Sequence, residues 1–266
     1  MNTLNKEIIY NKRLQAGYYR MALRWDTPLI RPGQFVMLRA TGSLDPLLRR
    51  PLGIYNVLGS DGKDGFRGNA VELLYRVVGR GTALLSEKKP GDRVDVLGPL
   101  GNGFPAPKGG GADVIMVAGG MGIVPLYLFA KRLDGGTLFF GCRSKAEAGL
   151  IKDFRILKKR IMIATEDGSA GRQGLVTEIL DEELTPRSVI YACGPAGMLK
   201  ETARLSEKAG ARCYVSLERP MACGIGVCLG CAVKARNHTG KENRDYRMVC
   251  SDGPVFDSRD IDWEAF

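Results

Sequence analysis

Short apolar runs separated by turn residues fill the chain from residue 1 to about residue 103. The runs GQFVMLRA, LGIYNVL, AVELLYRVV and DRVDVL occupy residues 33–40, 52–58, 70–78 and 92–97. Proline–glycine pairs at 32–33 and 90–91 and the segment DGKDG at 61–65 separate them. Many short strands between turn signals, without a long helical period, predict a small antiparallel barrel over residues 1–103.

The pattern changes after the glycine- and proline-rich segment 101–113, where strands begin to alternate with helices. This alternation predicts a parallel sheet with helices on both faces, which is the architecture of a nucleotide-binding domain, over residues 104–217. The expected sheet has five strands, at 114–118, 137–142, 161–164, 188–193 and 212–217. Helices are expected at 123–133, 146–158, 174–183 and 195–209.

The remaining residues, 218–266, are rich in glycine and cysteine and contain only two strand candidates, at 231–235 and 246–250. Such a segment is too small to bury a core of its own. A metal cluster is the usual way to hold a module of this size together. We therefore expect three parts: a barrel, an α/β domain and a C-terminal metal module.

Composition agrees with a globular chain and excludes several classes of protein. The 266 residues are 44% hydrophobic and include 35 glycines, enough for two domains and a small module. No stretch approaches the roughly 20 apolar residues that span a membrane. The first residues, MNTLNKEIIYNKR, are charged and lack the apolar centre of a secretory signal. A cytoplasmic protein without a membrane segment is expected.

The formal net charge of +10 does not indicate nucleic-acid binding, because lysine and arginine are scattered without a basic stripe. The charge is explained equally by a solvated surface and by binding of anionic cofactors or an acidic partner. Composition leaves these two explanations open.

Cysteine is distributed unevenly, and four of the seven cysteines lie in the last 44 residues. Disulfides are disfavoured in a reducing cytosol, so the crowding indicates a metal site. The spacing C-x4-C-x2-C, followed by a fourth cysteine after an 18-residue gap, is the pattern of plant-type [2Fe-2S] clusters. The predicted iron ligands are Cys223, Cys228, Cys231 and Cys250.

The glycines between these cysteines fit the same interpretation. Three thiolates on one short loop must converge on a small inorganic core, and Gly224, Gly226 and Gly230 permit the positive φ angles of such a loop. They also leave backbone N–H groups free to point at the cluster sulfides. The alternative is a four-cysteine zinc site, although zinc modules usually pair their ligands in two short knuckles. A Rieske centre needs two histidines, whereas His238 is the only one.

Two glycine turns follow strands of the predicted sheet, at the edge where open parallel sheets bind ligands. The first has the pattern G-x-G-x-x-P and leads into a helix whose N-terminal amides can receive a pyrophosphate. The second follows the strand at 188–193. Two such turns in one sheet predict a nicotinamide dinucleotide site. The candidate residues are Gly119, Gly120, Gly122 and Pro125 in the first turn, and Cys193, Gly194 and Pro195 in the second.

The choice between NAD and NADP is not decided by these turns. Ordinary dinucleotide folds place an acidic residue after the second strand to hold the adenine ribose. Here Arg143, Ser144 and Lys145 follow the strand instead. They favour a 2′-phosphate if they face the adenosine, or they are ordinary surface charges.

The predicted barrel contains a third set of candidates. An arginine for a diphosphate, a tyrosine for ring stacking and a glycine–threonine helix start for a phosphate together make a flavin site. Taken singly, each is also compatible with a structural turn or a surface arginine. The candidate flavin-binding residues are Arg50, Pro51, Leu52, Gly53, Leu74, Tyr75, Arg76, Gly81 and Thr82.

In this order, the flavin motif and the two glycine turns resemble the ferredoxin–NADP reductase superfamily. With the ending that runs from Cys223 to Cys250 and on through Ser-Asp-Gly-Pro254, the whole chain resembles the electron-transfer subunits of NAD-dependent dihydroorotate dehydrogenases. This resemblance implies FAD, one [2Fe-2S] cluster and NAD. It also implies an FMN-containing catalytic partner that oxidises dihydroorotate, in a heterotetramer of two plus two subunits, within pyrimidine biosynthesis.

Two positions depart from the pattern of that family. Gly53 stands where the family usually has serine or threonine, so a hydrogen bond near the flavin is expected to be missing. The gap before Cys250 is long, which predicts an extended hairpin.

The resemblance implies electron transfer from the partner's FMN to the cluster, then to FAD and finally, as hydride, to NAD. No general base is needed in this chain, and no catalytic residue is predicted. Two other functions remain possible on the sequence. The chain is alternatively a related reductase subunit of a bifurcating transhydrogenase or a sulfhydrogenase, or a redox sensor without turnover.

Overall fold

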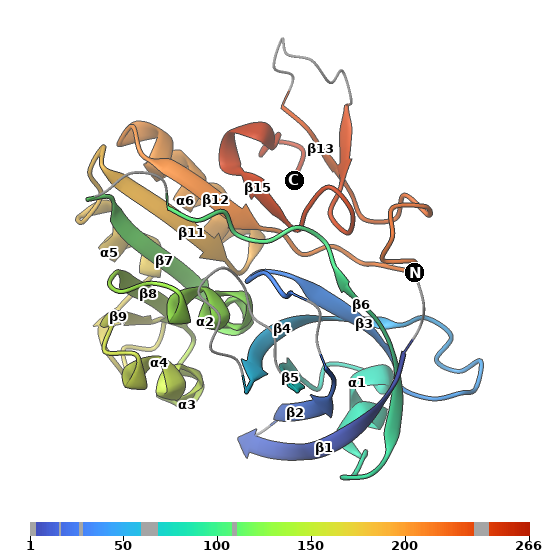
Figure 1. The fold of residues 1–266 in the computed structure, drawn as a ribbon. Helices are drawn as coiled ribbons and strands as arrows, with labels where there is room; N and C mark the ends of the chain where they lie inside the picture. Colours follow the sequence, from blue (N-terminus) through green and yellow to red (C-terminus); the bar gives the residue numbers. More distant parts are fainter. Residues whose placement is uncertain (1–3, 16, 27–28, 60–68, 108–110, 237–244) are drawn as a thin grey trace.

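The computed structural model describes residues 4–15, 17–26, 29–59, 69–107, 111–236 and 245–266 (Figure 1). The expected turn at 61–65 and His238 lie outside the described residues. Among the described residues, no helix is long and apolar enough to cross a membrane.

Six strands of the N-terminal part close into an antiparallel barrel, in the order β1-β2-β5-β4-β3-β6. Four of them correspond to the expected runs, whereas β1 and β2 were not anticipated as strands. Apolar side chains of alternate positions fill the barrel, with Met21, Leu73 and Val96 fully buried. The elements are β1 Leu4–Gln15, β2 Tyr18–Arg24, β3 Phe35–Arg39, β4 Arg50–Leu58, β5 Ala70–Arg76, α1 Arg80–Ser86 and β6 Arg93–Leu100.

The second part is a parallel sheet whose five central strands are those expected from the sequence, in the order β9-β8-β7-β11-β12. Two short strands extend it: β10 pairs parallel with β9, and β15 pairs antiparallel with β12. The expected five-stranded sheet therefore has seven strands. They are β7 Asp113–Gly119, β8 Thr137–Cys142, β9 Arg160–Thr165, β10 Arg172–Gln173, β11 Ser188–Cys193, β12 Arg212–Ser216 and β15 Val255–Asp257.

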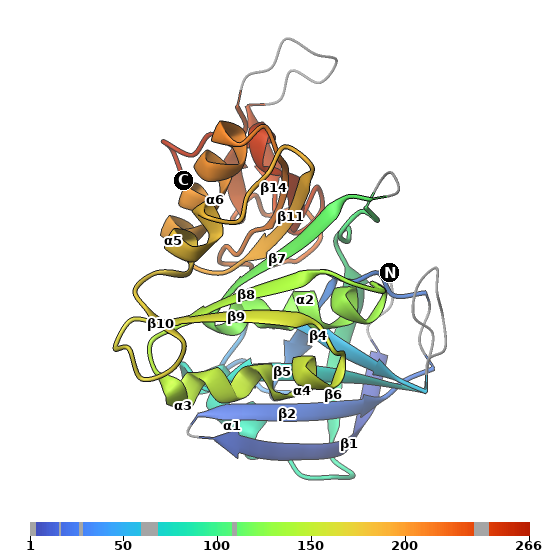
Figure 2. The ribbon, with the colours of Figure 1, turned by 90° about the vertical axis from the view of Figure 1, so that its left-hand side faces the viewer.

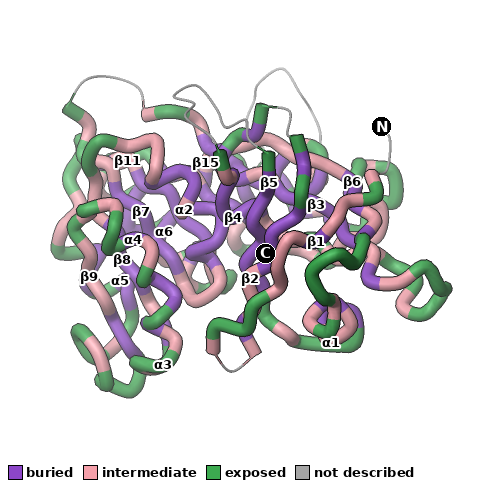
Figure 3. The backbone as a smooth tube through the Cα atoms, turned by 60° about the horizontal axis from the view of Figure 1, so that its bottom comes forward, coloured by how far each residue is buried: buried purple, intermediate pink, exposed green. Residues whose placement is uncertain are grey.

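Helices cover both faces of this sheet, as the alternating pattern predicted. Figures 1 and 2 show α5 and α6 on one face, and α2 between the other face and the barrel. The single helix expected at 146–158 is broken into α3, a 3-10 turn at Gly149–Ile151 and α4. The helices are α2 Ile123–Lys131, α3 Lys145–Ala148, α4 Lys152–Ile156, α5 Val176–Asp181 and α6 Ala196–Lys208. Figure 3 shows that the buried backbone is concentrated in the strands and in α2.

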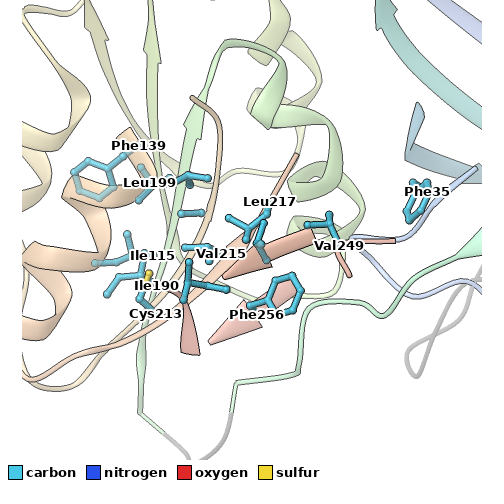
Figure 4. Packing of buried hydrophobic residues seen from close by; sticks show 14 of the residues in the cluster. Phe35, Ile115, Phe139, Ile190, Leu199, Cys213, Val215, Leu217, Val249 and Phe256 are labelled. Carbon is cyan, nitrogen blue, oxygen red and sulfur yellow. The ribbon is translucent and has the colours of Figure 1, made fainter. Parts of the chain in front are cut away.

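The C-terminal segment packs into the core of the other two parts instead of forming one of its own. Strands β13 Ala232–Lys234 and β14 Tyr246–Met248 form the hairpin expected before Cys250, and its tip lies outside the described residues. Val249 and Phe256 share one buried cluster with Leu217 of the sheet and Phe35 of the barrel (Figure 4). This segment therefore ties the two larger parts together.

Polar contacts also join the barrel to the α/β part. Arg20 of β2 forms an ion pair with Asp153 of α4, and the Tyr55 hydroxyl donates to the same carboxylate at 2.7 Å. The Lys131 ammonium at the end of α2 donates to the Asn56 side chain of β4 at 2.9 Å. These partly buried contacts fix the position of the nucleotide-binding edge relative to the barrel.

Candidate functional site

The four candidate iron ligands fall into two close pairs. Cys223, Cys228 and Cys231 lie on the loop between β12 and β13, and Cys250 directly follows Val249 after β14. The sulfur atoms of Cys231 and Cys250 are 3.3 Å apart. The side chain of Cys228 is hydrogen-bonded to Cys223. A [2Fe-2S] core bound by four cysteines needs two thiolates on each iron, and this is the grouping observed.

Backbone N–H groups point at the cysteine sulfurs, as the glycine-rich loop predicted. Ile225 and Cys228 each donate to the Cys223 sulfur at 3.4 Å, and Gly226 donates to the Cys250 sulfur at 3.1 Å. Burial opposes ionisation of Cys223, but the hydrogen bonds to its sulfur outweigh burial and lower its pKa to about 6. At Cys223 the loop therefore favours the thiolate, the form that binds metal, whereas burial raises the pKa of the Cys250 thiol.

The loop turns at Gly224, Gly226 and Leu229, which have φ angles of +74°, +83° and +58°. Gly224 and Gly226 behave as expected, but Gly230 does not take a positive φ, and Leu229 supplies the third left-handed residue. Gly224 also faces the barrel: a Cβ there would lie 2.7 Å from Cγ of Met37. The loop thus lies directly against strand β3.

The two-plus-two grouping of the cysteines fits a binuclear cluster. Cys231 and Cys250 are buried among apolar side chains, whereas Cys228 is exposed. The site therefore connects the protein core to the surface.

A cavity of about 560 Å³ lies between the barrel, α2 and the segment that leads to the cysteine loop. Eight of the nine candidate flavin-binding residues line it, and only Gly81 does not. Two residues assigned to the nucleotide site, Pro125 and Cys193, also line this cavity. The opposite wall comprises Ser216, Leu217, Glu218, Arg219, Pro220, Met221 and Pro254.

Gly81 does not line the cavity itself, but it leaves room for the side chain of Arg50, which does. A Cβ on Gly81 would overlap the Arg50 side chain, so the missing side chain leaves the space that the guanidinium occupies. The Thr82 hydroxyl is already engaged, because it accepts from the N–H groups of Val78 and Gly79 at 3.0 and 3.2 Å. Thr82 therefore closes the start of α1. Its hydroxyl is already hydrogen-bonded within the protein and is not available to bind a phosphate.

The side chain of Tyr75 is not available for the expected stacking on a flavin. Its ring stacks on Tyr19 with 5.7 Å between centroids, and its hydroxyl donates to Asn11 at 3.0 Å. Successive residues of a strand face opposite sides, so Leu74 and Arg76 turn toward the cavity while Tyr75 fills the barrel. Tyr75 nevertheless lines the cavity.

Gly53 lies directly against α2 in the wall of the same cavity. A Cβ at this position would lie 3.1 Å from Cγ1 of Val124, which is tight for an ordinary contact. The glycine that departs from the family pattern is therefore matched by a close approach of helix α2.

A second cavity, of about 590 Å³, lies at the carboxyl edge of the parallel sheet. It is lined by Gly119, Gly120 and Gly122 of the first turn, and by Gly194 and Pro195 of the second. Pro125 stands in the first turn of α2, where its missing N–H leaves no hydrogen bond unmade. Both predicted turns therefore open on one cavity.

The cavities meet at three residues that line both of them: Arg76, Met121 and Glu218. Glu218 was not predicted from the sequence, because nothing in its local pattern distinguishes it from a surface acid. Glu218 is exposed, but the protein atoms around its carboxyl partly desolvate it, and this desolvation raises its pKa.

Arg143, Ser144 and Lys145 differ in their relation to the second cavity. Of these three residues only Arg143 lines the cavity, and Glu147 and Glu166 line it beside Arg143. Glu147 accepts hydrogen bonds from the Tyr18 hydroxyl and the Arg143 N–H, both at 3.2 Å. Two carboxylates therefore lie beside one guanidinium at this end of the cavity.

The fold and the three adjoining sites define an iron–sulfur oxidoreductase built on the ferredoxin-reductase architecture. Residues 218–262 match the family described as the iron–sulfur cluster binding domain of dihydroorotate dehydrogenase B. The dihydroorotate dehydrogenase B (NAD(+)) electron transfer subunit of Caldanaerobacter subterraneus subsp. tengcongensis is 37% identical over 97% of this chain and 98% of its own. That of Geobacillus thermodenitrificans is 42% identical over 86% of each chain.

The chain belongs to the family of electron transfer subunits of dihydroorotate dehydrogenase B, which confirms the resemblance drawn from its motifs. Among solved structures, an NADH-dependent reduced ferredoxin-NADP oxidoreductase, described in a study of flavin-based electron bifurcation, has a TM-score of 0.80. It is 28% identical and covers 99% of this chain and 91% of its own.

Proposed function

We propose that this chain relays electrons from the FMN of a dihydroorotate dehydrogenase catalytic subunit, through its [2Fe-2S] cluster and FAD, to NAD. Its relatives are electron transfer subunits of dihydroorotate dehydrogenase B (NAD(+)), and this indicates both the enzyme and the nucleotide. The geometry described above supports the order of the three sites within this chain.

One observation carries the proposal: the flavin cavity adjoins both other sites. On one side it shares Arg76, Met121 and Glu218 with the nucleotide cavity. On the other side its wall is the segment 216–221, which enters the cysteine loop two residues later, and Pro254, which follows Cys250. This order is the one that a relay requires.

The binding residues follow from the cavity walls. Arg50, with the space left by Gly81, is placed to hold the FAD diphosphate, while Leu52, Gly53, Leu74 and Arg76 enclose the flavin. Pro51 and Tyr75 complete that wall. Thr82 organises the start of α1.

The nucleotide residues divide between the two cavities. Gly119, Gly120, Gly122, Gly194 and Pro195 receive NAD. Pro125 and Cys193 lie where the nicotinamide meets the flavin, because they line the flavin cavity although they belong to the nucleotide turns.

The chemistry of the bound groups explains the division of the chain: nicotinamide exchanges hydride, a cluster passes single electrons, and a flavin does both. The protein keeps the cluster partly buried and the two cavities in contact. We place the complex in the cytosol, with two copies of each subunit.

The proposal is tested by two assays. The purified chain should reduce an artificial acceptor with NADH, and the chain mixed with the catalytic subunit should form NADH from dihydroorotate and NAD. Failure of the first assay would contradict the reductase assignment. Rapid bleaching of the flavin absorbance by NADH would eliminate the alternative of a redox sensor that does not turn over.

A second candidate function is favoured by the structural match at a TM-score of 0.80. It is the role of a flavin-containing subunit in an electron-bifurcating ferredoxin–NADP oxidoreductase. Reconstitution with each candidate partner discriminates the two, because only the dihydroorotate dehydrogenase subunit should yield orotate.

A further inference from the structure

We propose that the docking loop, residues 41–49 between β3 and β4, forms with the cysteine loop 223–231 a single face that the catalytic subunit covers. This inference rests on the proposed function, because it takes the occupant to be the protein that delivers electrons to the cluster.

The docking loop exposes three leucines within five positions. Leu44, Leu47 and Leu48 are 82%, 55% and 50% exposed. Single exposed apolar side chains are normal on a protein surface, but a group of three large ones on one short loop marks an interaction site.

Polar contacts in the middle of the loop and at its C-terminal end hold it while its leucines remain exposed. Asp45 forms an ion pair with Arg80 of α1 at 2.7 Å, and Arg49 forms one with Asp95 of β6 at 2.6 Å. The Ser43 hydroxyl donates to the carbonyl oxygen of Asp45 at 2.9 Å. A loop that is already ordered loses less conformational entropy when a partner binds.

The cysteine loop has the same character. Ile225, Val227 and Leu229 are 45%, 74% and 63% exposed, and they alternate with residues that hold or turn the loop. Across the described residues, twelve large apolar side chains are exposed, and six of them lie on these two nine-residue loops. Such a concentration is not expected of an evenly solvated surface.

The two loops are neighbours through strand β3. Gly224 of the cysteine loop lies against Met37 of β3, and β3 runs into the docking loop after Arg39. Figure 1 shows both on the right-hand side of the molecule, the docking loop in light blue below the orange cysteine loop. They therefore face the same side.

The position of the cluster and the area that a stable interface needs identify the partner that covers this face. Electrons enter where the cluster approaches the surface, at the exposed Cys228, so the covering molecule must carry a redox group of its own. A stable interface buries about 800 Å² on each side, contributed by about 20–30 residues, which the cysteine loop alone does not provide. The docking loop extends the face toward that size with apolar anchors.

The test compares a triple variant, Leu44→Ser/Leu47→Ser/Leu48→Ser, with a matched control, Leu14→Ser/Leu29→Ser/Ile156→Ser, whose side chains are also exposed and apolar. Binding to the catalytic subunit is measured by calorimetry. The docking-loop variant should raise Kd about a hundredfold, while the control leaves Kd within about a factor of three. Both variants should keep the iron content and the NADH-dependent dye reduction of the wild-type chain.

An unchanged Kd for the triple variant, or an equal loss in the control, would overturn the proposal. If the wild-type chain alone self-associates and the triple variant does not, the occupant is a second copy, and the proposal is again wrong. The single variant Leu44→Ser, at the most exposed position, should raise Kd measurably even if the triple variant folds poorly. Loss of dye reduction in the wild-type chain would refute the proposed function instead, because binding is measured independently.

Discussion

Gly122 and Cys193 are in backbone contact: a Cβ on Gly122 would overlap the carbonyl oxygen of Cys193. The first residue ends the glycine turn after β7, and the second begins the turn after β11, with 70 residues between them. The two nucleotide motifs are therefore one packed unit, in which each turn fixes the shape of the other.

This contact predicts that Gly122→Ala disrupts the nucleotide site. The backbone of one turn must move away from the other, which should cost at least about 2 kcal/mol of unfolding free energy. NADH-dependent dye reduction should fall more than about tenfold. Gly135→Ala is the matched control, because a Cβ there meets nothing within 4 Å. Wild-type activity in Gly122→Ala would show that the turns are not interlocked.

Gly81→Ala should act on the flavin without unfolding the protein. The new methyl group displaces the flexible side chain of Arg50 and leaves the backbone in place. The purified variant should lose most of its FAD while its thermal unfolding changes little, and Arg50→Ala should give the same result. A variant that retains FAD at the wild-type stoichiometry would remove Arg50 from the flavin site.

Glu166→Gln should weaken the preference for NAD. Removing one of the two carboxylates beside Arg143 reduces repulsion of a 2′-phosphate bound there. We expect the ratio of kcat/KM for NADPH to that for NADH to rise about tenfold. Glu87→Gln, which replaces an exposed acid of the barrel, should leave the ratio unchanged. A ratio that does not move would place the selectivity elsewhere.

The raised pKa of Glu218 predicts a pH-dependent effect on stability. The folded chain holds this proton more tightly than the unfolded chain, whose glutamate has an ordinary pKa of 4.5. Ionisation above that value therefore costs stability, and Glu218→Gln avoids the cost. The variant should have a higher Tm than wild type at about pH 8, and the difference should vanish near pH 4. A lower Tm at the higher pH would contradict this assignment.

The sequence predicted best what depends on short spacing. The cysteine pattern and the two glycine turns are local constraints, and each lies where it was expected. Strand β1 was missed because, although it has twelve residues, only Ile8 is buried. Its alternation is therefore too weak to recognise.

The roles of single side chains were harder to predict, because they depend on which face of an element points where. Tyr75 belongs to the flavin motif, yet its ring fills the barrel. Leu229 takes the left-handed conformation that was expected of Gly230, because the loop and not the residue type fixes the turn. The junction at Glu218 depends on the packing of two domains, which no local pattern records.

The central claim is that this chain is a relay with the cluster between the partner and FAD. It is tested most directly by removing the cluster while the electron exchange between NADH and FAD is kept. Cys250→Ser in the reconstituted complex should lower the iron content and abolish NADH formation from dihydroorotate. The same complex should still reduce dye with NADH, and Cys213→Ser, which replaces a buried thiol outside the cluster, should leave dihydroorotate-dependent NADH formation intact. NADH formation at the wild-type rate in a Cys250→Ser complex that lacks the cluster would contradict the account.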